Sequence, residues 1–330
     1  MILDINKYKK EILIINSEEE FNSLAINAFL YQYDNNSVYQ DYCKHLNIIP
    51  HQINKLEQIP FIPIEFFKSH KLISNTDKIE TTFESSGTTG MQRSHHHIND
   101  LKHYENCFVD TFSKFYGSPD NYVILGLLPS YLERSGSSLV YMVNKLIKLS
   151  SNKRSGFYLD EFDSLHETIL KLETEKQKYI LIGVSFALID FANTHPINIQ
   201  SGIVMETGGM KGRRKELTKT ELHKFLSKHF KTKNIHSEYG MTELLSQAYS
   251  KENGIFRTPT QMKIMIRDTY DPLSVSKSGT GAINVIDLAN IDSCCFIATS
   301  DLGKVQKDGT FSIKGRFDHA EIRGCNLLVY

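Results

Sequence analysis

The chain has 330 residues, of which 40% are hydrophobic and 11% aromatic, enough to fill the core of one large domain or two modest ones. Lysine plus arginine and aspartate plus glutamate are balanced at 38 each, and no long block of like charge occurs. This balance argues against nucleic-acid binding, for which a basic patch or arm is typical.

Targeting signals and disulfides are not expected. The first ten residues, MILDINKYKK, carry charge where a signal peptide needs an apolar stretch, and no apolar run approaches the roughly 20 residues that span a bilayer. We therefore predict a cytoplasmic protein without a membrane span. The five cysteines include no C-x-x-C pair, and Cys294 and Cys295 are adjacent, so reduced thiols are expected.

The first predicted element is a helix. Ser17 to Glu20 fits a capping box, and apolar residues follow at the spacing of one helix face. From Ile59 the stretch IPFIPIEFFK holds two prolines, which favours an extended edge segment over a helix interior. The chain then enters FESSGTTGMQRSHHH, residues 83–97, after which Asp100 is expected to start a helix and Cys107, like Cys43, to pack in the core.

Beyond this loop, short apolar runs alternate with amphipathic stretches. The runs lie at 122–128, 179–186, 202–206 and 234–240, and the candidate helices at 137–149, 162–176 and 215–230. This alternation predicts an α/β layered sandwich with mixed sheets. After about residue 255, short strand-like segments with Gly, Pro, Asp and Ser turns predict a C-terminal β-rich subdomain.

The SSGTTG hexapeptide, residues 85–90, is the first candidate binding site. A loop rich in Gly, Ser and Thr turns backbone N–H groups and hydroxyls toward an anion, so phosphate is the natural ligand. The pattern G-x-x-x-x-G-K-[ST] is absent, as is G-x-G-x-x-G after a strand. The hexapeptide alone leaves phosphate binding and a plain surface turn equally open.

Two later stretches favour a nucleotide. SEYGMTE, residues 237–243, presents a ring, a glycine, a hydroxyl and a carboxylate, a set suited to stacking a base, bonding a phosphate oxygen and holding Mg²⁺. In TSDLGKVQKDGTFSIKGRFD, residues 299–318, Asp301 and Arg316 flank a predicted hairpin whose turn is Asp308-Gly309. Such a carboxylate and guanidinium suit the hydroxyls of a ribose and a phosphate.

In this order, SSGTTG, YGMTE and SDLG with GR resemble the adenylate-forming superfamily of acyl and aryl acid ligases. More narrowly, the chain resembles the acyl-protein synthetases, the long-chain fatty acid ligase component of bacterial bioluminescence, near the phenylacetate ligases. The narrower resemblance rests on LLPSYLERSGSSLVYMV at 127–143, TGGMKGRRKEL at 207–217 and INVIDLANIDSCCFIATSDLG at 283–303. It covers residues 59–330.

The resemblance implies the large N-terminal domain of adenylate-forming enzymes without their small mobile C-terminal domain. We expect one domain over residues 1–330, with a helical lead-in and edge segment at 1–80, a nucleotide-binding core at 81–255 and the β-rich subdomain at 256–330. The catalytic lysine of the small domain then has no counterpart, and another cation must meet the phosphate charge. The candidates are Arg93, His95, His96, Lys211 and Arg213.

The resemblance also implies the roles of individual residues, with ATP and Mg²⁺ as cofactors. The residues expected to bind the β- and γ-phosphates are Ser85, Ser86, Gly87, Thr88, Thr89 and Gly90. Tyr239 is expected against adenine, Thr242 on the α-phosphate, Glu243 on Mg²⁺, and Asp301 with Arg316 on the ribose. Gly208 and Gly209 form a turn along the nucleotide, and Gly240 and Met241 complete the nucleotide-binding set.

The three histidines after the loop invite a metal hypothesis, which is the less expected one, because adjacent side chains diverge. Relatives place a basic or imidazole group there, and we predict His95 as the one that faces the phosphates or the acyl channel.

The predicted function is ATP-dependent activation of a fatty or other hydrophobic acid to acyl-AMP, with release of pyrophosphate. The acyl group then passes to a thiol, with Cys325 in EIRGCNLLVY as the candidate, and on to an acyl-accepting protein. Two alternatives stay open. Either the acyl-AMP passes directly to a carrier protein, coenzyme A or a small nucleophile while Cys325 is an inert core residue, or the chain is a non-catalytic nucleotide-binding subunit. The acid, the final acceptor and the oligomeric state are not readable from the sequence.

Overall fold

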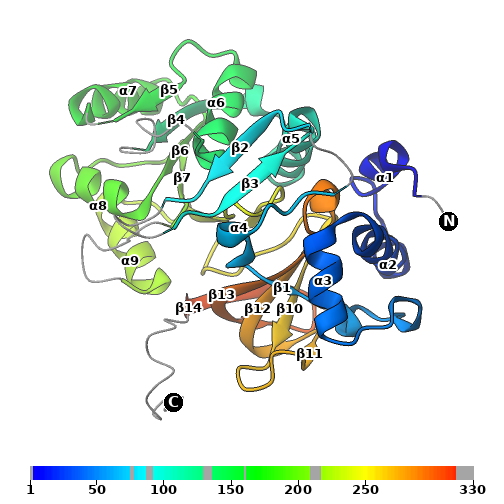
Figure 1. Cartoon of the computed structure of the whole chain (residues 1–330). Coiled ribbons are helices and arrows are strands. Elements are labelled where there is room, and N and C mark those ends of the chain that lie inside the picture. Colours follow the sequence, from blue (N-terminus) through cyan, green and yellow to red (C-terminus); the bar gives the residue numbers. More distant parts are fainter. Residues whose placement is uncertain are drawn as a thin grey trace.

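Two six-stranded sheets and a two-stranded hairpin form the frame of the protein (Figure 1). The computed structural model describes residues 3–74, 78–86, 92–128, 136–159, 161–208 and 217–316. Helices and strands alternate in the middle of the chain, and strands dominate after residue 255. The predicted α/β architecture with mixed sheets and a β-rich C-terminal part is confirmed.

The first sheet is mostly parallel and has the strand order β5-β4-β6-β7-β8-β9. Its strands are β4 (Val123–Leu127), β5 (Gly156–Tyr158), β6 (Tyr179–Gly183), β7 (Gly202–Glu206), β8 (Ile235–Tyr239) and β9 (Ala248–Ser250). Only the pairing of β9 with β8 is antiparallel. β4, β6 and β8 are buried along their whole length, as expected for parallel strands covered on both faces.

Helices cover both faces of this sheet. They are α5 (Leu101–Tyr116), α6 (Ser138–Ser150), α7 (Phe162–Thr174), α8 (Ser185–Thr194) and α9 (Lys219–Phe230). Asp100, Ser137 and Thr218 cap α5, α6 and α9, each by accepting a backbone N–H of the first turn. Asp100 thus starts a helix as predicted, whereas the Thr218 cap places the start of α9 at Lys219, later than the predicted residue 215.

The second sheet has the order β1-β13-β12-β10-β11, with β14 paired to β13. Its strands are β1 (Ile62–Pro63), β10 (Met262–Arg267), β11 (Val275–Ser276), β12 (Gly279–Asp287), β13 (Phe296–Val305) and β14 (Phe311–Arg316). The predicted edge segment is confirmed at β1, which lies at one end of the sheet. The rest of that segment is not extended, because α4 (Phe66–Ser69) begins three residues after Pro63.

The N-terminal region is helical, as predicted. It contains α1 (Ile5–Glu11), α2 (Glu18–Asn35) and α3 (Ser37–His45), and the short 3-10 helices of the chain are η1 (Pro50–Gln52), η2 (Leu56–Gln58), η3 (Pro119–Asn121) and η4 (Leu288–Asp292). Ser17 Oγ accepts the N–H of Glu20 at 3.1 Å. The Glu20 carboxylate accepts the N–H of Asn16, not that of Ser17, so the predicted capping box is only half formed.

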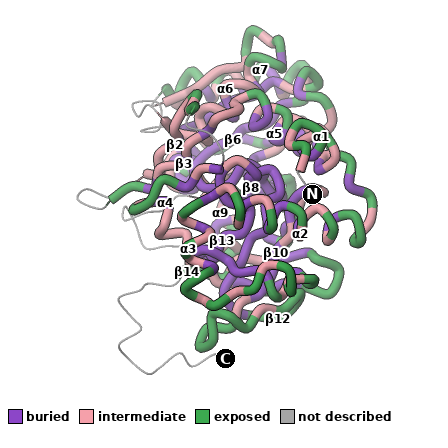
Figure 2. Tube along the Cα trace, turned by 45° about the vertical axis from the view of Figure 1, so that its right-hand side comes forward, coloured by how far each residue is buried: buried purple, intermediate pink, exposed green. Residues whose placement is uncertain are grey.

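This N-terminal region shares a core with the second sheet. Gln32 Nε2 in α2 donates to the carbonyl of Asn290 at 2.9 Å, and the Tyr8 hydroxyl donates to the carbonyl of Leu288 at 3.2 Å. Because β1 also joins β13, the predicted lead-in and β-rich subdomain are parts of one packed unit. Figure 2 shows buried residues running through the interior and exposed ones at the periphery. In the described part of the chain, no helix has the length and apolar character needed to cross a membrane.

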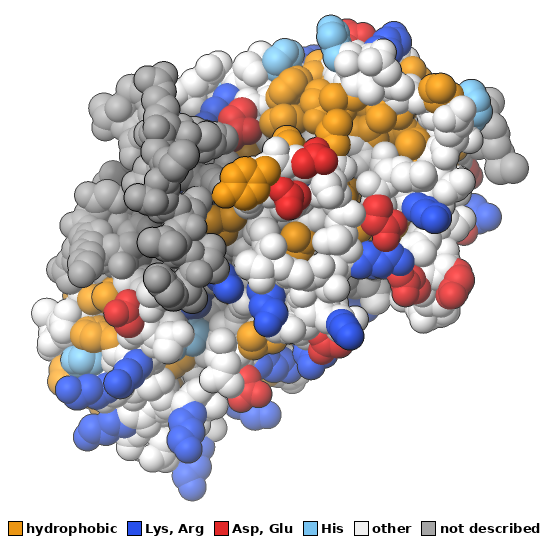
Figure 3. All heavy atoms as spheres, turned by 90° about the horizontal axis from the view of Figure 1, so that it is seen from below, with side chains coloured by type: hydrophobic (Ala, Val, Ile, Leu, Met, Phe, Trp, Pro, Cys, Tyr) orange, Lys and Arg blue, Asp and Glu red, His pale blue; other side chains and the backbone are white. Residues whose placement is uncertain are grey.

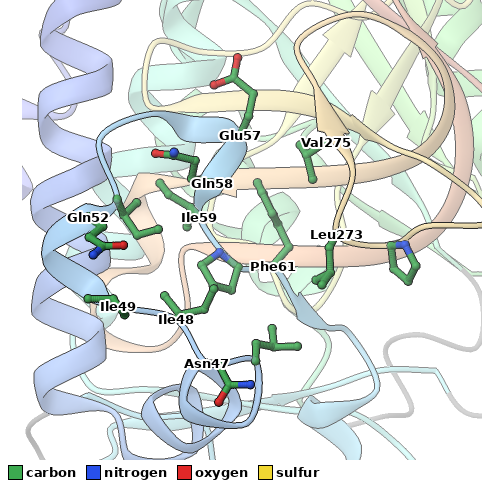
Figure 4. Close-up of a pocket in the computed structure, with 14 residues that line it drawn as sticks. Asn47, Ile48, Ile49, Gln52, Glu57, Gln58, Ile59, Phe61, Leu273 and Val275 are labelled. Carbon is green, nitrogen blue, oxygen red and sulfur yellow. The ribbon is translucent and has the colours of Figure 1, made fainter.

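A pocket of about 440 Å³ lies in this N-terminal and C-terminal unit (Figure 4). Apolar side chains from the segment after α3, such as Ile48, Ile59 and Phe61, face Leu273 and Val275. Figure 3 views the molecule from below and shows hydrophobic side chains gathered in one broad area. The pocket lining contains none of the residues predicted to bind nucleotide.

Candidate active site

The Ser/Thr/Gly loop joins β2 (Thr81–Glu84) to β3 (His95–Ile98), two antiparallel strands. At its base, the N–H of Ser85 donates to the carbonyl of Ser94 at 3.1 Å, and Ser85 Oγ accepts the N–H of Ser94 at 2.9 Å. These bonds hold the two ends of the loop together. Of the predicted phosphate-binding residues, Ser85 and Ser86 are described, whereas Gly87, Thr88, Thr89 and Gly90 lie outside the described residues.

The three histidines of β3 point alternately, as side chains on a strand must. His95 Nε2 lies 3.8 Å from Glu84 Oε1, and Arg93 donates to Glu84 Oε2 at 3.0 Å, so one carboxylate engages two of the candidate cations. His96 is fully buried, and its Nδ1 lies 2.8 Å from the carbonyl oxygen of Thr242. Among the described residues, no group of three or more His, Cys, Asp and Glu side chains is placed to hold a metal ion.

His96 therefore connects the loop hairpin to the second motif. Burial lowers the pKa of His96 to about 4, so the ring is neutral at physiological pH and donates its Nδ1 proton to the Thr242 carbonyl. The carbonyl of Glu243 accepts from Asn290 Nδ2 at 2.8 Å. Two buried side chains from distant parts of the chain thus fix the backbone of Thr242 and Glu243.

The segment after Glu243 is held from the second sheet. Asp287, at the end of β12, accepts the N–H of Leu245 at 2.8 Å and the N–H of Ser246 at 2.9 Å. It also accepts the Ser246 hydroxyl at 2.7 Å. Sequence reasoning missed His96, Asp287 and Asn290 as supports. The only available signal was the presence of polar residues in the apolar stretch INVIDLANID.

Tyr239, Asp301 and Arg316 meet although they are far apart in sequence. The Tyr239 hydroxyl donates to Asp301 Oδ2 at 2.8 Å, and Arg316 Nε donates to Asp301 Oδ1 at 2.9 Å. The charge of Asp301, and more weakly that of Glu243, raises the pKa of Arg316. A carboxylate has further lone pairs, so Asp301 keeps acceptor capacity for ribose hydroxyls. The predicted hairpin is confirmed, with Gly309 at φ 80° in its turn.

The Tyr239 ring is more enclosed than an open stacking platform. It is 9% exposed and contacts the rings of Phe256 and Phe311 at centroid distances of 5.9 and 5.4 Å. Gly240, Met241 and Thr242 follow it at the surface or half-buried, and Glu243 is buried again. An adenine on Tyr239 would have to use the edge that these phenylalanines leave exposed.

Glu206, at the end of β7, forms a second charged centre. Its carboxylate is fully buried, pairs with Lys219 and accepts the N–H of Gly208 at 3.0 Å. Burial opposes ionisation, but Lys219 and hydrogen bonds from His223 and Ser237 lower the pKa of Glu206 to about 2. No local pattern in the sequence predicts this ion pair.

Gly208 occupies a position that suits a bound group. Its φ is 71°, and no described atom lies within 4 Å of the point that a Cβ would take. Beside it, Thr207 Oγ1 is buried without a hydrogen-bond partner among the described residues. An open backbone and an unpaired hydroxyl at the end of a parallel strand fit a nucleotide. Gly209, Lys211 and Arg213 lie outside the described residues.

The described cysteines are poor nucleophiles. Cys43, Cys107, Cys294 and Cys295 are all buried and free. Burial raises the pKa of each thiol, to about 12 for Cys43 and Cys294. Cys43 and Cys107 are therefore packing residues, as predicted. Cys325 lies outside the described residues.

Comparison with known proteins shows which enzymes this chain resembles. The family model of acyl-protein synthetase, LuxE, matches residues 11–102. The long-chain-fatty-acid–luciferin-component ligase of Aliivibrio fischeri is 22% identical, and the match covers 87% of this chain and 79% of that protein. The resemblance to the acyl-protein synthetases is confirmed. The match includes the N-terminal helices, which the sequence-based resemblance from residue 59 onward had left out.

Solved structures show the same fold. The 2-hydroxyisobutyryl-CoA ligase in the postadenylation state with R3-HIB-AMP superposes with a TM-score of 0.66 at 10% identity, covering 91% of this chain and 68% of that one. ATP-bound MatB from Rhodopseudomonas palustris gives 0.51 at 17% identity, with 73% and 49% covered. The chain thus spans about half of MatB. The fold of the adenylate-forming ligases is confirmed.

Asp301→Asn is expected to raise the KM for ATP about 10- to 100-fold. It removes the charge that Arg316 pairs with and weakens the carboxylate that is predicted to accept hydrogen bonds from the ribose. Pyrophosphate exchange at varied ATP measures the effect. Asp308→Asn is the matched control, because Asp308 is an exposed turn residue on the same hairpin. An unchanged KM for ATP in Asp301→Asn would contradict the ribose assignment.

Proposed function

We propose that this protein activates a hydrophobic carboxylic acid with ATP and then transfers the acyl group to a thiol. The observation that carries the proposal is the meeting of Tyr239, Asp301 and Arg316, beside the supported backbone of Thr242 and Glu243. The similarity to a ligase that joins long-chain fatty acids to a luciferin component supports a fatty acid and a protein acceptor.

In the first half-reaction, an oxygen of the acid attacks the α-phosphorus of ATP. The bond from that phosphorus to the bridging oxygen breaks, pyrophosphate leaves, and acyl-AMP forms. Thr242 donates its hydroxyl to the α-phosphate, and Ser85 and Ser86 with Gly87–Gly90 hold the departing phosphates. Asp301 and Arg316 bind the ribose, and Tyr239 contacts the adenine.

Positive charge is needed because both reactants are anions. A carboxylate such as Glu243 is the oxygen ligand that Mg²⁺ prefers, and the ion would neutralise phosphate charge. The carboxyl group of Glu243 is buried, and it lies close enough to Arg316 to raise the pKa of that guanidinium. Arg93 is an additional cation near the loop, where it pairs with Glu84, and His95 Nε2 lies 3.8 Å from the same carboxylate.

In the second half-reaction, a thiolate attacks the acyl carbon of acyl-AMP. The carbon–oxygen bond to AMP breaks, AMP leaves, and a thioester forms after the thiol has lost its proton. Because the four described cysteines are buried with raised pKa values, Cys325 is the acceptor in this proposal. A partner protein then receives the acyl group.

Cys325→Ala is expected to abolish covalent acylation and to leave ATP–pyrophosphate exchange within about twofold of wild type, because the thiol acts only after adenylation. Intact-mass measurement after incubation with ATP, Mg²⁺ and acid detects the adduct. Cys43→Ala is the matched control and should still be acylated. Wild-type protein without an adduct, together with full acyl transfer by Cys325→Ala, would favour direct transfer from acyl-AMP to the acceptor.

A further inference from the structure

Glu238 is a buried carboxyl group that the proposed reaction does not use. It lies on β8, directly before Tyr239, and is 7% exposed. Its carboxyl group makes no hydrogen bond with the side chains described, and its oxygens do not belong to the fully enclosed side-chain atoms without a partner. Burial, together with the charge of Glu206, raises the pKa of Glu238 to about 8, so the group is mostly protonated at neutral pH. A largely buried carboxyl group without a protein partner needs another hydrogen-bond partner, which water or a bound molecule can supply.

β8 separates two sides of the site. Ser237 and Tyr239 point to one face, where the Ser237 hydroxyl meets His223 of α9 and Tyr239 meets Asp301. Glu238 points to the opposite face, because successive side chains on a strand alternate. The nucleotide is assigned to the Tyr239 face. The Glu238 face, at the same end of the strand, is therefore the side left for the acid.

Aromatic residues of α5 and β9 surround Glu238 on that face. Tyr249 is its direct partner across the β8–β9 ladder, and Tyr116 contacts both the Tyr249 ring and His236. Burial and, further, the charge of Glu238 raise the pKa of Tyr104, Tyr116 and Tyr249. The surroundings are thus largely apolar, as a pocket for a hydrophobic acid requires.

Glu238 and Gln247 converge on Gly240. A Cβ added to Gly240 would overlap Glu238 Oε1 and lie 3.4 Å from Gln247 Cγ. Gln247 is 4% exposed, and its Oε1 has no hydrogen-bond partner among the described residues. Gly240 itself is exposed. A group bound over Gly240 therefore comes close to the Glu238 carboxyl group and to the side chain of Gln247, whose amide oxygen has no partner among the described residues.

We propose that Glu238 and Gln247 bind a hydroxyl group of the acid that this enzyme activates. A hydroxyl both donates and accepts: it gives its proton to Gln247 Oε1 and accepts the proton of the Glu238 carboxylic acid. Because Gly240 precedes Thr242 by two residues, the hydroxyl lies near the carboxyl end of the acid. The substrate class is a hydrophobic acid with a hydroxyl close to its carboxyl group. This inference rests on the proposed function.

An acid without the hydroxyl leaves both protein groups unpaired in the complex. Sites built to hydrogen-bond a hydroxyl reject analogues that lack it far more strongly than apolar pockets reject an extra methylene. An acid that carries a second anionic group is also expected to bind poorly. That group would be repelled by the charge of Glu206 and, at alkaline pH, by the charge of Glu238.

The test is ATP–pyrophosphate exchange with pairs of acids that share one chain length and differ only by a hydroxyl at carbon 2 or 3. Wild type is expected to show kcat/KM at least about tenfold higher for one hydroxy acid than for its unsubstituted partner. Glu238→Leu and Gln247→Leu should remove this preference, with the larger change in KM for the acid. Glu238→Gln, which can still donate and accept, should keep most of it.

The outcomes separate this inference from the function on which it rests. Exchange with unsubstituted acids at the same or higher kcat/KM overturns the hydroxyl subsite and leaves adenylation standing. The same follows if Glu238→Leu and Gln247→Leu slow both members of each pair equally, since a merely structural role does that. No exchange with any acid, despite ATP binding, overturns the proposed function and this inference with it.

Discussion

Replacing Glu243 by glutamine is expected to reduce ATP–pyrophosphate exchange by a factor of about 10² to 10⁴, the usual range for losing one charge-stabilising group in a preorganised site. Glutamine preserves the size of the side chain but removes the negative charge that attracts Mg²⁺. The backbone of Glu243 is held by Asn290, and its neighbour Thr242 by His96, so the local structure should persist. The exchange rate at saturating ATP and acid measures the loss.

A magnesium titration makes the test specific. If Glu243 holds the ion, Glu243→Gln needs more Mg²⁺ for half-maximal exchange, and wild type treated with a chelator loses exchange in the same way. Glu252→Gln is the matched control, because Glu252 is exposed on the turn after β9. Exchange at the wild-type rate and magnesium requirement in Glu243→Gln would contradict the assigned role.

Sequence reasoning found the parts of the site that depend on local pattern. Asp308-Gly309 forms the turn between β13 and β14, because its composition favours a turn conformation, and Ser85 follows β2 directly as expected. Asp301 and Arg316 stand at corresponding positions of one hairpin, so their pairing follows once the turn is located. Their assignment to a ribose stays a prediction.

Supports that come from other parts of the fold could not be predicted. Whether His95 or His96 points inward depends on which face of the short strand β3 is covered by other elements. Three identical residues show no alternation of polar and apolar side chains, so the sequence HHH does not indicate the buried face. The inward one is His96, because its face meets the Thr242 carbonyl. The pairing of Glu206 with Lys219 likewise depends on how α9 packs beside β7.

The contact between the predicted lead-in and the β-rich part could not be predicted for a similar reason. β1 precedes its partner β13 by more than 200 residues, and no local pattern reports such a pairing. Buried hydrogen bonds also connect α2 to η4, because the Gln32 amide donates to the carbonyls of Asn290 and Ile291. Because Asn290 also donates to the carbonyl of Glu243, the N-terminal helices contact a residue that supports the candidate active site.

Glu238→Gln is expected to stabilise the fold at alkaline pH. The pKa of Glu238 is raised from 4.5 to about 8, chiefly by burial, so the folded state holds a proton that the unfolded state has lost. The contribution of Glu238 to stability is therefore full below pH 4.5 and is lost as the pH rises through about 8. A shift of this size corresponds to about 4 to 5 kcal/mol at pH 9. Glutamine never carries this charge.

Chemical denaturation of wild type and Glu238→Gln at pH 5, 7 and 9 measures the difference. The two proteins should be nearly equal at pH 5, and the free energy of unfolding of the variant should exceed that of wild type increasingly toward pH 9. Glu252→Gln, at an exposed position, should follow wild type throughout. A constant difference between Glu238→Gln and wild type at all three pH values would mean that Glu238 ionises alike in both states. The carboxyl would then reach water, and a bound hydroxyl would no longer be needed to explain its burial.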